Sequence, residues 1–154
     1  MMSATIAEII SKHQQGILLV YTGIGKGKTG AALGQAMRAL GHDKKVFFLG
    51  CTEHDDAIKE LPGLTVVHKN NAGELLQVVK QILTSGSHEL LIIDAVDATG
   101  TASSLQEELG EFLASLKNSA QSTDIIVTGK TVAEKIVSLA DTVSFFTHGG
   151  KGGE

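Results

Sequence analysis

Six short apolar segments recur along the chain, and polar or amphipathic stretches separate them. They lie at 17–21, 46–49, 64–68, 90–94, 124–128 and 142–146. Their nearly continuous hydrophobicity is typical of strands that are buried on both faces. The pattern therefore predicts a mainly parallel sheet of about six strands.

Amphipathic segments with helical spacing lie between most of the expected strands. The clearest of these segments cover 28–40, 74–84 and 104–117. We expect the first helix to end at Gly41, because glycine is common directly after a helix. A further helix is expected in "TVAEKIVSLA", where Thr131 and Glu134 stand in capping-box positions.

The two ends of the chain are expected to lie outside this alternating core. Residues 1–15 carry three isoleucines at helical spacing, which predicts a short N-terminal helix. Residues 147–154, "THGGKGGE", are rich in glycine and are expected to form a mobile tail. No linker or repeat divides residues 1–154, so we expect a single domain. Strands that alternate with helices indicate a three-layer α/β fold with right-handed crossovers.

Charge and cysteine content narrow the classes of function. A formal net charge of −4 argues against a generally basic surface, so we expect no nucleic-acid partner. Cys51 is the only cysteine, which excludes an internal disulfide and a multi-cysteine metal site. We expect it to be a small buried residue near the end of a strand. No segment approaches the roughly 20 apolar residues of a membrane span and no signal peptide is recognisable, so we expect a cytoplasmic protein.

The stretch "VYTGIGKGKTGAALG" at 20–34 holds five glycines, and three of them, Gly23, Gly25 and Gly27, lie between the first expected strand and the first expected helix. Glycines let the backbone curl so that several N–H groups point inward, and the helix N-terminus adds partial positive charge. Gly27, Lys28 and Thr29 match the last three positions of the P-loop pattern, whereas Thr22 stands where the strict pattern has its first glycine. The segment therefore predicts a variant phosphate-binding loop. A tight turn with solvated lysines is the alternative.

Each part of this loop has an expected role. Lys28 contacts the outer phosphates as the catalytic residue, Thr29 offers its hydroxyl to magnesium, and Lys26 adds charge at the rim. The expected nucleotide-binding residues are Thr22, Gly23, Ile24, Gly25, Lys26, Gly27, Lys28, Thr29, Gly30 and Lys130.

An acidic residue at the end of a neighbouring buried strand completes a site of this kind. Asp94 ends the apolar segment "LLIID", and we expect it to hold Mg²⁺ together with Thr29. Asp97 is a weaker candidate for the same task, and a helix cap is the alternative role for Asp94. Ala95 stands where hydrolytic P-loop enzymes often carry a glutamate that orients water. The site therefore does not resemble that of an efficient ATPase.

Three segments together resemble the P-loop corrinoid adenosyltransferases. "TGIGKGKTGAALGQAMRALGH" follows the "GxGKGKTT-A" loop of that family, "IIVTGK" is similar to its "TGR", and "LADTVSFF" is similar to its "ADxV" element. The likeness covers about residues 16–143. It implies a RecA-like P-loop fold, ATP with Mg²⁺, a reduced corrinoid as co-substrate, and a homodimer. The implied reaction moves the 5′-deoxyadenosyl group of ATP to cobalt with release of triphosphate. A cobalt(I) nucleophile carries no proton, so this reaction needs no general base.

The sequence also departs from this family. Gly30 replaces the second threonine of the loop, Ala95 replaces the glutamate of a "DE" pair, and Lys130 replaces an arginine, which loses bidentate geometry. The block "HKNNAGE" at 68–74 is shorter than the family's corrinoid-facing segment, and the chain contains no tryptophan. A catalytically reduced ATP-binding protein with a sensing or regulatory role is therefore a second hypothesis. An ATP-dependent ligase or kinase is a third.

Overall fold

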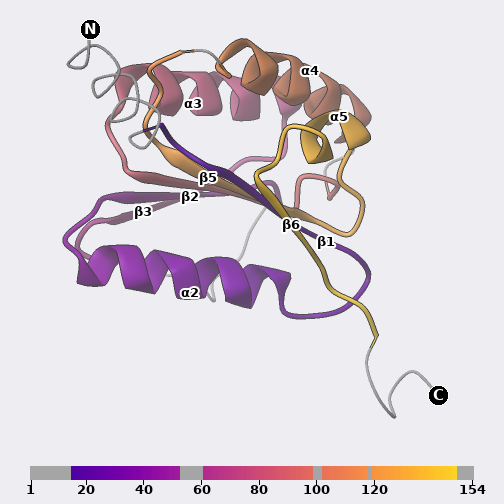
Figure 1. The fold of residues 1–154 in the computed structure, drawn as a ribbon, viewed down its shortest axis with the longest axis horizontal. Coiled ribbons are helices and arrows are strands. Elements are labelled where there is room, and N and C mark those ends of the chain that lie inside the picture. The colour runs from indigo at the N-terminus through magenta and orange to yellow at the C-terminus, as the bar shows by residue number, and fades with distance from the viewer. Residues whose placement is uncertain (1–14, 53–60, 99–101, 118, 149–154) are drawn as a thin grey trace, which may run out of the picture.

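The computed structural model describes residues 15–52, 61–98, 102–117 and 119–148. Within these residues, six strands form one sheet with helices on both of its faces (Figure 1). The strands are β1 (Leu18–Thr22), β2 (Val46–Gly50), β3 (Leu64–His68), β4 (Leu90–Asp94), β5 (Asp124–Gly129) and β6 (Thr142–Phe145). The helices are α2 (Lys28–Gly41), α3 (Ala72–Ser85), α4 (Ala102–Ser115) and α5 (Glu134–Val137).

The strand order is β3-β2-β4-β5-β1-β6, and every neighbouring pair is parallel. All carboxyl ends of the strands therefore lie at one edge of the sheet, which is the edge where sheets of this kind bind ligands. Strand β5 separates β1, which leads into the glycine loop, from β4, which ends at Asp94. The expected α/β fold of the P-loop type, with its parallel six-stranded sheet, is confirmed.

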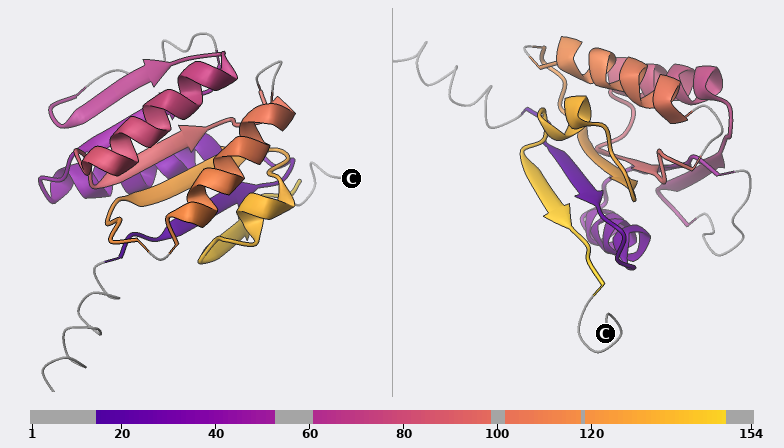
Figure 2. Two further views of the ribbon diagram at one scale, coloured as in Figure 1. Left: turned by 90° about the horizontal axis from the view of Figure 1, so that it is seen from above. Right: turned by 90° about the vertical axis from the view of Figure 1, so that its right-hand side faces the viewer.

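The sheet lies between two unequal helical layers (Figure 2). Helix α2 covers one face by itself, whereas α3, α4 and α5 cover the other. Ala32 and Ala36 of α2 are fully buried against a patch that includes Phe48 of β2. Their small side chains let the helix approach the sheet closely, so the start of α2 is held firmly at the carboxyl edge.

The predicted end of the first helix is confirmed, whereas a predicted helix start is wrong. Helix α2 ends at Gly41 with His42 in the C-cap position, and the chain turns at Asp43, where φ is 60°. Helix α5 is a single turn that begins after Ala133 without a side-chain cap, so the expected capping box at Thr131 does not form. The physical reason is tertiary. The buried side chain of Gln106 in α4 donates to the Thr131 carbonyl and accepts from the Ala133 amide, which takes over the capping.

The two expected terminal segments fall mostly outside the described residues. Only Gln15 of the predicted N-terminal helix is described, and of the predicted tail only Thr147 and His148 are, both exposed. Among the helices that the structure describes, none combines the length and the apolar character that crossing a membrane requires.

Candidate nucleotide site

The glycine loop between β1 and α2 is docked on the chain segments that follow its two neighbouring strands. The Gly25 amide donates to the Phe146 carbonyl at 2.7 Å, and the Phe146 amide donates to the Thr22 carbonyl at the same distance. On the other side, the Gly23 amide donates to the Lys130 carbonyl at 3.2 Å. Strands β5 and β6 therefore both hold the loop in place.

Glycines are required in this loop for two physical reasons. Gly23 and Gly27 have φ values of 109° and 107°, which residues with a Cβ rarely adopt. A Cβ on Gly25 would also lie 2.5 Å from the Thr147 carbonyl oxygen. The glycines thus serve the close approach of the segment after β6, a role that the pattern alone did not reveal.

The first turn of α2 presents open backbone donors. The amides of residues 26–30 have no hydrogen-bond acceptor among the described residues. Gly27 is the N-cap and provides no side-chain cap, so these donors stay open toward the loop. Open donors at the positive end of a helix are the arrangement that binds phosphate groups.

Lys28 folds back over the loop. Its half-buried ammonium donates to the carbonyl oxygens of Gly23 and Gly25, each at 2.6 Å, and lies 6.0 Å from the centroid of the Phe146 ring. Both acceptors are neutral, so a phosphate oxygen in their place would form a stronger hydrogen bond, because donor and acceptor would then carry opposite charges. The ammonium is thus held where an entering polyanion can exchange with the carbonyls.

The structure brings Thr29 and Asp94 together, although 65 positions separate them. The Thr29 hydroxyl donates to Asp94 Oδ1 at 2.8 Å, and the Thr128 hydroxyl donates to the same oxygen at 2.7 Å. Thr128 in turn accepts a hydrogen bond from the amide of Ala95, which has a φ of 60°. Asp94 is nearly buried, and these contacts fix the direction of its carboxylate.

This set of oxygen donors fits a magnesium ion. Mg²⁺ prefers oxygen ligands and usually binds through one or two carboxylates together with phosphates and water. Asp94 and Thr29 supply a carboxylate and a hydroxyl that already face each other. The described residues contain no cluster of three acidic, histidine or cysteine side chains that could enclose a metal alone. The site is therefore suited to a metal that arrives with a nucleotide.

A hollow of about 310 Å³ lies beside these residues at the carboxyl edge, where Lys28 and Thr29 form one wall. The remaining lining residues are Ala95, Asp97, Ala98, Thr128, Gly129 and Lys130. Lys130 is exposed and adds a second positive charge to the rim. Asp97 accepts a hydrogen bond from the Thr131 amide at 3.0 Å, so it also fastens the turn after β4 to the end of β5.

The other predicted loop contacts differ in accessibility. Thr22 is buried, and its hydroxyl donates to the Lys130 carbonyl at 3.3 Å. Ile24 and Lys26 are exposed at the loop surface, and Gly30 has open space where a side chain would stand. Direct nucleotide contacts by these four residues remain predictions.

The sequence reasoning missed two residues that shape the site, Phe146 and Thr128. Each lies at a carboxyl end of a strand next to a predicted site residue, but that adjacency follows from the strand order. A hydroxyl one residue before the "GK" of "VTGK" was the available signal for Thr128.

The expected structural role of Cys51 is confirmed. The residue lies directly after β2 and is fully buried in the core. Burial raises the pKa of its thiol to about 12, and the negative charges of Asp94 and Asp97 contribute to the increase. The thiol therefore stays protonated and is not a nucleophile or metal ligand at neutral pH.

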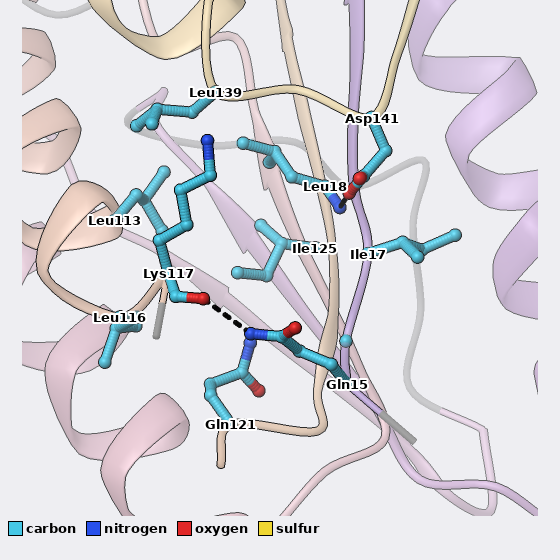
Figure 3. A pocket seen from close by; sticks show the side chains of 11 residues that line it. Gln15, Ile17, Leu18, Leu113, Leu116, Lys117, Gln121, Ile125, Leu139 and Asp141 are labelled. Atoms are coloured by element: carbon cyan, nitrogen blue, oxygen red, sulfur yellow. Dashed lines mark hydrogen bonds between the residues drawn. The ribbon is translucent and has the colours of Figure 1, made fainter. Parts of the chain in front are cut away.

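A separate hollow of about 230 Å³ lies at the opposite, amino edge of the sheet (Figure 3). Leucine and isoleucine side chains from β1, α4 and β5 line it, and several of its polar groups bind the protein's own backbone. Gln15 donates to the Lys117 carbonyl at 2.7 Å, and Asp141 accepts from the Leu18 amide at 2.8 Å. This hollow lies away from the ligand-binding edge of the sheet.

Comparison with known proteins places this chain in a family. A family model described as ATP:corrinoid adenosyltransferase BtuR/CobO/CobP matches residues 14–62 and 63–149. The corrinoid adenosyltransferase of Escherichia coli strain K12 is 30% identical over 154 aligned residues, which cover 87% of this chain and 78% of the relative. Corrinoid adenosyltransferase CobA of Salmonella typhimurium strain LT2 is 29% identical with the same coverage, and the Pseudomonas aeruginosa corrinoid adenosyltransferase is 27% identical, covering 87% of this chain and 76% of the relative. The chain belongs to the ATP:corrinoid adenosyltransferase family.

Proposed function

We propose that this protein is an ATP:corrinoid adenosyltransferase that transfers the 5′-deoxyadenosyl group of ATP to the cobalt of a reduced corrinoid. The electron pair of cobalt(I) forms the cobalt–carbon bond at C5′, the C5′–O bond breaks, and triphosphate leaves with the electron pair of the broken C5′–O bond. The observation that carries the proposal is the contact between Thr29 and Asp94 beside the open amides of α2, within a chain of this family.

The protein's residues act on the leaving group. In the proposed complex, the open amides at 26–30 bind phosphate oxygens, and the Lys28 ammonium exchanges its two carbonyl acceptors for them. Thr29 and Asp94 would hold Mg²⁺, which supplies charge neutralisation for the departing triphosphate. Since these donors are in place before the bond breaks, they stabilise the developing charge without reorganisation.

No general base is needed in this proposal, and the region around Asp94 agrees with that. Ala95 lines the hollow where a water-orienting carboxylate would serve hydrolysis. The alanine at position 95, in place of an acidic residue, also supports a catalytically reduced ATP-binding protein, which we retain as the second candidate. The proposal further includes a cytoplasmic location and, as the family resemblance implies, a homodimer.

The test is to incubate the full chain with ATP, Mg²⁺ and chemically reduced cobalamin and to follow the cobalamin absorption spectrum. Formation of adenosylcobalamin and triphosphate in equal amounts is expected. Asp94→Asn should lower the rate and weaken its dependence on Mg²⁺, while Glu111→Gln, an exposed change in α4, should not. If ATP binds and no adenosylcobalamin forms, the transferase proposal is wrong and the ATP-binding candidate takes its place.

A further inference from the structure

His68 is a half-buried residue whose two ring nitrogens are left unpaired by their surroundings. It ends β3, and both of its ring nitrogens are buried without a hydrogen-bond partner among the described residues. Buried polar groups in folded proteins are nearly always paired, because an unpaired group loses its water contacts without replacement. An unpaired imidazole at the ligand-binding edge of a parallel sheet therefore indicates a partner that arrives with the ligand.

The ring of His68 lies over Gly50 in the direction of Asp94. Gly50 pairs with His68 on one side and with Asp94 on the other, so the three residues form one row across β3, β2 and β4. A Cβ on Gly50 would overlap the imidazole, coming closest to Nδ1 and lying 2.6 Å from Cε1. The ring thus fills the space that the glycine leaves open.

Packing holds the ring in this position. The centroids of the His68 and Phe48 rings are 6.2 Å apart, and the ring planes are tilted by 55°. Directly paired residues in a sheet point to the same face, so His68 shares the face on which Asp94 meets Thr29 of α2. His68 therefore faces the same space as the candidate magnesium ligands.

The spacing favours an indirect contact with Asp94. Neighbouring strands are about 4.8 Å apart, so a ring above Gly50 lies about one strand spacing from Asp94. This separation is too long for a direct hydrogen bond, but one water molecule can bridge it. A neutral imidazole has one nitrogen that accepts hydrogen bonds, and the water molecules around a metal ion are strong donors.

We propose that His68 is a positioning residue for the magnesium ion, in which a ring nitrogen accepts a hydrogen bond from a water molecule of the coordination shell. The inference rests on the proposed function, because it requires a nucleotide-bound metal at Asp94 and Thr29. In this proposal His68 provides, from β3, a polar contact with the coordination shell of the metal that Ala95 cannot provide.

Mn²⁺ is a suitable probe because its paramagnetism reports directly on the metal. Its affinity for the full chain with bound ATP is measured from the electron paramagnetic resonance signal of free Mn²⁺. His68→Phe should weaken this affinity by about ten-fold or more, the scale of losing an outer-shell partner, and should leave ATP affinity without metal unchanged. His68→Gln should restore most of the affinity because its amide oxygen can accept the same hydrogen bond. His42→Gln, an exposed change at the far end of α2, is the control.

A second readout is independent of the variants. In protein labelled with ¹⁵N-histidine, Mn²⁺ with ATP should broaden the ring signals of His68 and leave those of His42 sharp.

The urea midpoint of His68→Phe should be equal to or higher than that of the parent protein, because the change removes unpaired buried nitrogens. A lower midpoint with unchanged Mn²⁺ affinity would instead assign His68 a structural role and overturn the inference.

The remaining outcomes separate this inference from the proposed function. If ATP and Mn²⁺ bind normally to His68→Phe and the His68 signals stay sharp, only the role of His68 is wrong. If corrinoid affinity alone falls, His68 contacts the second substrate and the inference is also overturned. If the parent chain binds no ATP, the proposed function and the inference both fail.

Discussion

The two edges of the sheet use similar polar groups in opposite ways. At the amino edge, the Ile17 amide donates to Asp124 Oδ1 at 3.0 Å and the Leu18 amide donates to Asp141 Oδ2 at 2.8 Å. These carboxylates bind the protein's own backbone at the start of β1, which holds β1 beside its neighbours in the sheet. The polar groups of this edge contribute to stability and leave little for a ligand.

At the carboxyl edge, the polar groups stay open instead. The amides at 26–30 lack acceptors among the described residues, Lys28 has only neutral acceptors, and the nitrogens of His68 are unpaired. A ligand gains most from groups whose hydrogen-bonding capacity the protein has not already used. The comparison teaches that open backbone amides at a helix N-terminus, more than the amount of polar surface, distinguish the candidate site from the hollow in Figure 3.

The largest expected effect on ATP binding comes from removing the positive charge of Lys28 at the carboxyl edge. Lys28→Ala should weaken ATP binding by about 2–4 kcal/mol, because the site then lacks its partly desolvated ammonium partner for phosphate. Isothermal titration calorimetry with ATP measures this change. Lys117→Ala, at the rim of the amino-edge hollow, is the matched control and should leave ATP affinity unchanged. Equal ATP affinity in the Lys28 variant and the parent chain would remove the contrast between the edges.

A change at the amino edge should alter stability alone. Asp141→Ala removes the acceptor of the Leu18 amide. The free energy of unfolding should therefore fall by about 1–2 kcal/mol, which is at the lower end of the range for hydrogen bonds to charged groups because Asp141 is exposed. Urea unfolding measures the loss, and ATP affinity should stay the same. Glu111→Ala removes an exposed ion pair with Lys135 and should change stability by less than about 1 kcal/mol. A clear fall in ATP affinity for Asp141→Ala would show that the amino edge influences binding at the carboxyl edge, and it would contradict the prediction.

Gly30→Ala sharpens the distinction between glycines within the loop region. No atom lies within 4 Å of a Cβ placed on Gly30, so the change should raise the free energy of unfolding by about 0.5–1 kcal/mol through helix propensity. Gly23→Ala is the opposing control, because its φ is 109° and its Cβ would clash with the Phe146 carbonyl. Thermal unfolding of both variants measures the contrast. Destabilisation by Gly30→Ala would mean that this position is as constrained as Gly23.

The smallest expected effect is a pH dependence at the amino edge. Partial burial, and then the positive charge of Lys45, lower the pKa of His88 below its usual 6.5, while Glu89 offsets part of this change. Below pH 6.5 the unfolded chain therefore binds more protons at His88 than the folded chain does. The stabilising contribution is present above this pH and is lost as the pH falls toward the lower folded pKa.

His88→Gln should flatten this part of the stability profile. Urea midpoints of both proteins, measured from about pH 7.5 down to about pH 5, test the difference in slope. ATP affinity should be the same in both proteins at each pH, because His88 lies just before β4, at the amino edge and away from the candidate nucleotide site. Parallel midpoint curves would show that the environment of His88 does not couple its proton to folding.

The strands were predictable because each is a continuous apolar segment, a signal that needs no knowledge of distant residues. The ends of helices were less predictable. The end of α2 at Gly41 agrees with the prediction, but the capping box at Thr131 fails because Gln106 from α4 binds that backbone. Local propensity describes what a segment can do, and contacts from elsewhere in the chain select among those options.

By itself the sequence determined the alternation of strands and helices, and it predicted a phosphate-binding loop at residues 22–30 with Thr29 and Asp94 as site candidates. The strands and the loop depend on local order, since a loop's glycines, lysine and hydroxyl lie within a few positions of one another. Only the tertiary structure decided that Thr128 directs Asp94, that Phe146 supports the loop, and that His68 lies unpaired over Gly50. These contacts depend on which strands are neighbours in space, and strand order is set by the packing of the whole sheet.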